Sequence, residues 1–164
     1  MNANENESGR PNGTVEMHGE RAMVAERVFD APRARVWAAY NDPKLIARWW
    51  GPARMTNRVE RMEVRPGGTW RIVSTATDGT EFGFHGEYRE VVPPEKLVQT
   101  FVWEGAPNDA LVQTATFHEE GNRTRMRLYV EFPSAANRQA MVVTGMEGGM
   151  REGWSRLDAV LAEA

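Results

Sequence analysis

The sequence has 164 residues, of which 41% are hydrophobic and 26% charged, and such a chain is long enough to bury the core of one ordinary globular domain. Its formal net charge of −3 argues against nucleic acid or an anionic membrane surface as a partner. With no cysteine, disulfides, thiolate metal sites and cysteine nucleophiles are excluded. No apolar run approaches the roughly 18 residues that cross a bilayer, and the chain begins with no signal-peptide pattern, so we expect a cytoplasmic protein.

Residues 1–19 are rich in asparagine, glutamate and glycine and are predicted to be a disordered polar tail. Residues 20–164 are predicted to form a single domain. A strand over Met23–Phe29 precedes two short helices. Pro32 suits the first turn of one helix, and Asn41-Asp42-Pro43 caps the other, which Gly51-Pro52 ends.

After Thr56 the apolar residues alternate, which predicts strands separated by turns at glycine and proline. Each strand has one buried face and one wet face, and consecutive strands with short turns favour an antiparallel meander. The expected strands are Arg58–Val64, Thr69–Thr75, Glu81–Val92, Leu97–Trp103, Leu111–His118 and Thr124–Phe132.

The last stretch of the chain has helical periodicity and is expected to cover the buried face of the sheet. A continuous helix over 135–162 would be about 42 Å long, at roughly 1.5 Å per residue. Gly149 and Gly153 lie on one flank of its apolar stripe. Their missing side chains predict either close backbone contact or empty space. The fold class is therefore α+β, with an antiparallel sheet of about seven strands and a long C-terminal helix.

Several motifs resemble one known superfamily. Phe29-Asp30-Ala31-Pro32, followed by Val36-Trp37, resembles the opening of the SRPBCC (START-like, helix-grip) superfamily. Further motifs resemble its branch named after the activator of the heat-shock-protein-90 ATPase: Trp49-Trp50-Gly51-Pro52, Arg65-Pro66-Gly67-Gly68-Thr69-Trp70-Arg71, Gly86-Glu87-Tyr88-Arg89-Glu90-Val91, Pro93-Pro94-Glu95-Lys96-Leu97-Val98 and Gly153-Trp154. The likeness runs from about Met23 to Leu161.

This resemblance implies a curved sheet that wraps around the C-terminal helix, with a cavity between them. The superfamily uses that cavity for lipids, hormones and polyketides, and some members are cyclases or hydrolases. The aromatic residues of this chain then form either an ordinary core or the wall of an apolar pocket. The candidate lining residues are Trp37, Tyr40, Trp49, Trp50, Trp70, Ile72, Phe84, Tyr88, Phe101, Trp103, Met146, Gly149, Met150, Gly153 and Trp154.

Arg27 is a candidate polar anchor, since it shares a strand face with Ala25 and Phe29. At the rim of a cavity its guanidinium could hold a carboxylate or phosphate head group. The alternative is a salt bridge to a glutamate of a neighbouring strand.

No catalytic residue, cofactor or metal is predicted. His85 and His118 are far apart and match no metal-binding spacing, and His85 is expected to face solvent. A general base would require desolvation of a strand carboxylate such as Glu63, Glu87 or Glu90.

Three functions follow, in this order of preference. The first is binding of a small apolar or amphipathic ligand between sheet and helix. The second is cyclase or hydrolase chemistry in the same cavity. The third is interaction with a chaperone, and it ranks last because no segment resembles the separate N-terminal domain that chaperone activators carry.

Overall fold

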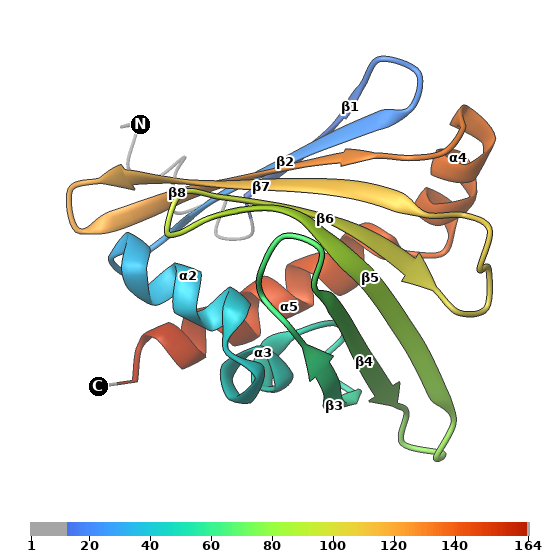
Figure 1. Cartoon of the computed structure of the whole chain (residues 1–164), viewed down its shortest axis with the longest axis horizontal. Coiled ribbons are helices and arrows are strands. Elements are labelled where there is room, and N and C mark those ends of the chain that lie inside the picture. The colour runs from blue at the N-terminus through green and yellow to red at the C-terminus, as the bar shows by residue number, and fades with distance from the viewer. Residues whose placement is uncertain (1–12, 164) are drawn as a thin grey trace, which may run out of the picture.

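The computed structural model describes residues 13–163, which form one curved antiparallel sheet with helices against its inner face (Figure 1). The strands pair in the order β1-β2-β8-β7-β6-β5-β4-β3. Their bounds are β1 Thr14–His18, β2 Ala22–Phe29, β3 Thr56–Met62, β4 Thr69–Thr75, β5 Glu81–Val92, β6 Lys96–Trp103, β7 Leu111–Glu120 and β8 Arg123–Glu131. The α+β helix-grip class predicted from the sequence is thereby confirmed.

Two short helices follow β2, and two more end the chain. They are α2 Arg33–Asn41, α3 Pro43–Trp49, α4 Ala135–Val143 and α5 Met146–Leu161. The Asp42 carboxylate accepts a hydrogen bond from the Lys44 amide at 2.8 Å and caps α3, as the sequence predicts. The Ser134 hydroxyl accepts from the Asn137 amide at 3.0 Å and caps α4 in the same way.

The prediction of a disordered tail over 1–19 is wrong for its last part. Strand β1 pairs with β2 along its whole length, from Thr14 opposite Glu26 to His18 opposite Ala22. An edge strand of this kind is held by backbone hydrogen bonds to its neighbour, so its polar composition does not prevent it from forming. Residues 1–12 lie outside the described part of the chain.

The prediction of a continuous C-terminal helix is also wrong. The helix breaks at Thr144 and Gly145, and Gly145 has a φ of +87°. This left-handed conformation is one that glycine adopts without the steric cost that a Cβ would bring. Helix α4 buries none of its residues, whereas α5 carries the buried part of the stripe.

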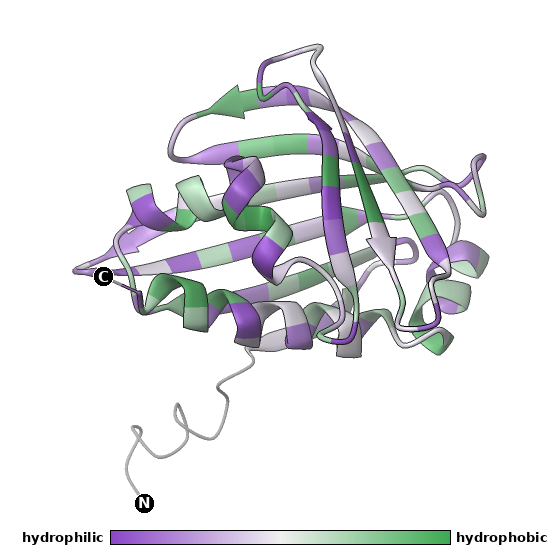
Figure 2. Cartoon of the chain, turned by 90° about the horizontal axis from the view of Figure 1, so that it is seen from below, coloured by the Kyte–Doolittle hydropathy of each residue, from purple (hydrophilic) through white to green (hydrophobic). Residues whose placement is uncertain are grey.

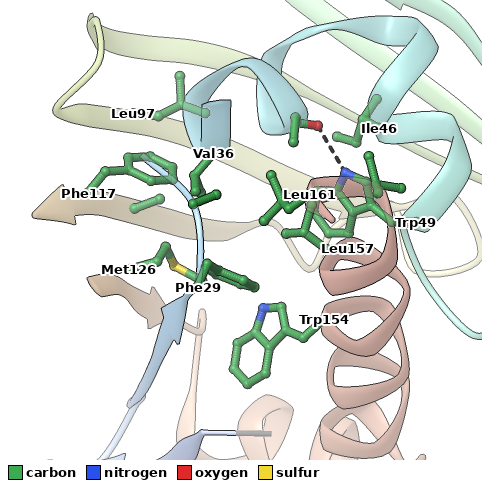
Figure 3. Close-up of a cluster of buried hydrophobic side chains, with 14 of the residues drawn as sticks. Phe29, Val36, Ile46, Trp49, Leu97, Phe117, Met126, Trp154, Leu157 and Leu161 are labelled. Atoms are coloured by element: carbon green, nitrogen blue, oxygen red, sulfur yellow. Dashed lines mark hydrogen bonds between the residues drawn. The ribbon is translucent and has the colours of Figure 1, made fainter. Parts of the chain in front are cut away.

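The C-terminal half of α5 is the part of the helix that is packed into the core. It packs there with α2, α3 and the inner face of the sheet (Figure 3). Leu157 is fully buried there, next to Trp154 and Leu161, and Trp49 donates its indole N–H to the Ala39 carbonyl oxygen at 2.9 Å. The strands alternate between hydrophobic and hydrophilic residues along their length (Figure 2). The inner face of the sheet is therefore apolar also where this core does not cover it.

No helix within residues 13–163 combines the length and apolar character that a membrane crossing requires. The cytoplasmic location stays a prediction.

Candidate functional site: a cavity between the sheet and α5

A cavity of about 510 Å³ lies between the inner face of the sheet, the end of α3 and the N-terminal half of α5. This volume falls within the range of about 300–1,000 Å³ that is usual for small-molecule sites. The cavity is partly open to solvent. Lining residues that are exposed or half-buried include Trp103 at the end of β6, Pro52 and Met55 after α3, and Thr144 and Gly145 at the helix break.

Aromatic rings from three adjacent strands and from the residue after α3 form one wall. Trp50 lies with its ring centroid 5.0 Å from that of Phe84 and 6.4 Å from that of Trp70. The Phe101 ring stands 5.5 Å from Phe84 and 5.9 Å from Trp70. The Trp70 indole N–H donates to the Thr100 carbonyl oxygen at 3.2 Å, so the polar end of this ring is satisfied within the sheet. The cavity is therefore bounded by flat, rigid, apolar surfaces.

The predicted lining residues come together here with one exception. Trp37 lies off the lining and instead packs edge-on against Phe117, with ring centroids 5.5 Å apart. The others all line the cavity: Tyr40, Trp49, Trp50, Trp70, Ile72, Phe84, Tyr88, Phe101, Trp103, Met146, Gly149, Met150, Gly153 and Trp154. Their contact with a ligand stays a prediction.

Sequence reasoning missed the polar members of the lining. Gln99 and Gln113 occupy inward positions on β6 and β7, and Ser74 does so on β4. The two glutamines are register partners, and the Gln99 amide Nε2 donates to the Gln113 Oε1 at 3.3 Å. The sequence did contain a signal, because each glutamine occupies a position where the alternation of its strand calls for an apolar residue. Gln99, for example, lies on the same face of its strand as Leu97 and Phe101.

Other missed residues are apolar side chains that complete the wall, among them Met23, Ile46, Met55, Met62, Phe82, Leu111, Leu128, Val130 and Met141.

Formal charge is absent from the described lining, which contains no Asp, Glu, His, Lys or Arg. Its ionisable groups are the phenols of Tyr40 and Tyr88. Burial raises the pKa of both hydroxyls, and for Tyr40 this outweighs the hydrogen bond that its oxygen accepts from Trp154 and the charge of Arg27. Both phenols are therefore neutral at physiological pH.

The model of the family described as "Activator of Hsp90 ATPase homolog 1-like protein" matches residues 30–162. The chain belongs to this family. A solution structure of a protein from Arthrobacter aurescens is 32% identical over 92% of both chains, with a TM-score of 0.86. A crystal structure from Mycobacterium smegmatis is 25% identical over 92% of this chain and 97% of that one, with a TM-score of 0.83.

A Rhodobacter sphaeroides protein shares the fold, with a TM-score of 0.85 at 22% identity over 91% of this chain and 97% of that chain. No curated protein matches the sequence.

In this member of the family, Arg27 is placed off the cavity lining. Its side chain is 5% exposed and forms an ion pair with Asp158 of α5, while its guanidinium carbon lies 5.2 Å from the Phe29 ring centroid and 5.9 Å from that of Trp154. The partner is an aspartate of the helix and not the strand glutamate considered from the sequence. Because the Arg27 guanidinium pairs with Asp158 and does not line the cavity, its position gives no support to Arg27 as an anchor for a head group.

The two flanking glycines of α5 have different neighbours. A Cβ on Gly153 would stand 3.2 Å from the Trp49 carbonyl oxygen and 3.4 Å from the Gly51 nitrogen, so the helix touches the chain after α3 with its backbone. A Cβ on Gly149 would meet only Pro52, at 3.6 Å. Of the two alternatives predicted from the sequence, close backbone contact therefore applies to Gly153 and empty space applies to Gly149.

The carboxylates considered as general bases, Glu63, Glu87 and Glu90, are not among the lining residues, and all three are exposed. His85 is half exposed on the outer face, and its Nδ1 lies 2.9 Å from Glu104, which also pairs with Arg71 at 2.8 Å. Within the described range, no three His, Asp or Glu side chains are grouped so as to hold a metal ion.

Proposed function

We propose that this protein binds a small apolar or amphipathic molecule in the cavity between the sheet and α5. The observation that carries the proposal is an uncharged, largely apolar space of about 510 Å³ beside an otherwise well-packed core. An ordinary core closes on itself, because unfilled apolar volume lowers the free energy of unfolding. An open cavity with aromatic walls has the properties of a ligand site.

The break between α4 and α5 supports the same proposal. Met141 and Met146 lie on either side of it and both line the cavity. Methionine side chains are flexible and polarizable, so they adapt to ligands of different shape.

The alternative functions have less support. Cyclase or hydrolase chemistry in this cavity would require an acid or base of suitable pKa, and the described lining offers only neutral phenols, hydroxyls and amides. A chaperone interaction would need a contiguous exposed apolar patch. The large apolar side chains exposed within residues 13–163 lie mostly on separate elements: Met17, Val92, Trp103, Val142 and Val143.

A titration of the ¹⁵N-labelled protein with 2-naphthol, followed by its tryptophan indole signals, tests the proposal. Five tryptophans line the cavity, and Trp37 serves as an internal control on the other side of the core. We expect saturable shifts of the indole signals of Trp49, Trp50, Trp70, Trp103 and Trp154, with Trp37 unchanged. Absence of any saturable shift with 2-naphthol and with a panel of longer apolar alcohols would refute the proposal.

A further inference from the structure

A row of three neutral polar side chains crosses the apolar wall of the cavity. Tyr88 on β5 is the register partner of Gln99 on β6, which in turn is the partner of Gln113 on β7. Register partners in antiparallel strands point to the same face of the sheet, and all three line the cavity. On β6 and β7 the neighbours of the two glutamines on that face are apolar: Leu97, Phe101, Leu111 and Ala115.

Most of the hydrogen-bonding capacity of this polar row is unused within residues 13–163. The bond from Gln99 to Gln113 takes one donor and one acceptor, although each carboxamide offers two N–H groups and a carbonyl oxygen. The hydroxyl of Tyr88, a residue only 1% exposed, has no hydrogen-bond partner in this part of the chain. Polar groups in apolar surroundings are normally paired, because leaving them unpaired costs free energy.

The lack of charge on the lining limits what these groups can receive. A carboxylate or phosphate drawn into the cavity would lose its hydration without gaining a cationic partner, and the nearby Arg27 already pairs with Asp158. An uncharged hydroxyl or carbonyl carries a much smaller desolvation cost. Carboxamides suit both groups, since they donate and accept hydrogen bonds.

We infer that the polar row of Tyr88, Gln99 and Gln113 selects an uncharged ligand: a flat apolar body with a hydroxyl or carbonyl group that hydrogen-bonds to the row. This inference rests on the proposed function and names the ligand class of the same cavity. The aromatic wall takes the body of the ligand, and the polar row fixes its orientation.

Three probes with one ring system, naphthalene, 2-naphthol and 2-naphthoate, test the inference about the ligand class separately from the proposed function. All three present the same apolar body. Naphthalene adds no polar group, 2-naphthol adds a neutral hydroxyl, and 2-naphthoate adds a negative charge. At neutral pH we expect 2-naphthol to bind at least about tenfold more tightly than 2-naphthoate, because the cavity holds no counter-charge. Failure of 2-naphthol, naphthalene and the longer apolar alcohols all to bind would refute the proposed function itself.

Two variants then test the polar row. Gln99→Met and Gln113→Met keep the side-chain length and remove the amide, and we expect each to weaken 2-naphthol about two- to tenfold while leaving naphthalene unchanged. Tyr88→Phe serves as a second route if either glutamine variant is poorly folded. Thr114→Val is the matched control, since this residue points outward between Gln113 and Ala115 on β7.

Two results would overturn the inference while leaving the cavity as a binding site. One is 2-naphthoate binding as tightly as 2-naphthol. The other is 2-naphthol affinity that is unchanged in all three polar-row variants.

Discussion

Arg27 of β2 and Asp158 of α5 form an ion pair that joins the C-terminal helix to the sheet. The Arg27 side chain is 5% exposed and lies against the rings of Phe29 and Trp154. Asp158 is 45% exposed, so the pair is open to water on the helix side. It holds α5 in place just beyond the cavity.

Replacement of Asp158 with alanine should lower the free energy of unfolding by about 1–3 kcal/mol, because a buried guanidinium loses its charged acceptor. The double variant Arg27→Met, Asp158→Ala should cost less than the sum of the two single changes, since no unpaired charge remains in it. Urea unfolding of the three variants measures this coupling. Strictly additive costs would show that the two side chains do not interact.

Gly149→Leu should affect ligand binding, whereas Gly153→Leu should affect stability. A leucine at Gly153 would press on the backbone of Trp49 and Gly51, so we expect a loss of about 1–3 kcal/mol or more in stability. A leucine at Gly149 has room beside Pro52 and should leave a folded protein with a smaller cavity and weaker 2-naphthol binding. Thermal unfolding and a binding titration of both variants check this, and equal destabilisation would contradict the assignment of Gly149 to free space.

The helix break at Gly145 predicts a contrast between two neighbouring glycines. Gly145→Ala should lower the free energy of unfolding by about 1–2 kcal/mol, because its φ of +87° is unfavourable for a residue with a Cβ. Gly148→Ala should raise it by up to about 1 kcal/mol, since this residue is helical and a Cβ there would meet nothing within 4 Å. Urea unfolding compares the two. A neutral effect of Gly145→Ala would mean that the helix can continue through this point.

The cluster of Arg71, His85 and Glu104 on the outer face of the sheet predicts a loss of stability in acid. Hydrogen bonds from Arg71 and His85 lower the pKa of Glu104 from 4.5 to about 2. A carboxyl whose pKa is lowered by folding stabilises the folded state above its unfolded pKa, and this contribution is lost as the pH falls from about 4.5 towards 2. The stability difference between the wild type and Glu104→Gln should therefore shrink across that window.

Urea unfolding at several pH values measures this difference, with the exposed Glu152→Gln as the control. A difference that does not change with pH would show that Glu104 is not held in its ionised form.

Much of the fold could be predicted from the sequence, because alternation and turn residues mark strands directly. The bounds of β4 and β5 match the predicted ranges. Strand β1 could not be predicted in this way, since its pairing with β2 depends on a partner and not on its own composition. The break at Gly145 was equally hidden, because a glycine in a helical pattern can be either tolerated or used to end a helix.

The candidate site was predictable only in part. Met150 and Leu157 belong to the same apolar stripe of α5, yet the first lines a cavity and the second is fully buried in the core. Periodicity shows which face of an element is covered, but not how completely the opposite surface fills the space. That depends on where α2 and α3 sit, which is a property of the assembled chain.

The most direct test of the ligand cavity is a search for intermolecular nuclear Overhauser effects between 2-naphthol and protein carrying ¹³C-labelled methionine methyl groups. Met62, Met146 and Met150 line the cavity, Met126 is buried outside its lining, and Met17 is exposed on β1. We predict effects from the naphthol ring to methyl groups of lining methionines, among them Met62, Met146 and Met150, with none to Met126 or Met17. Effects confined to Met17, or none to any lining methyl group at a saturating concentration, would contradict the account.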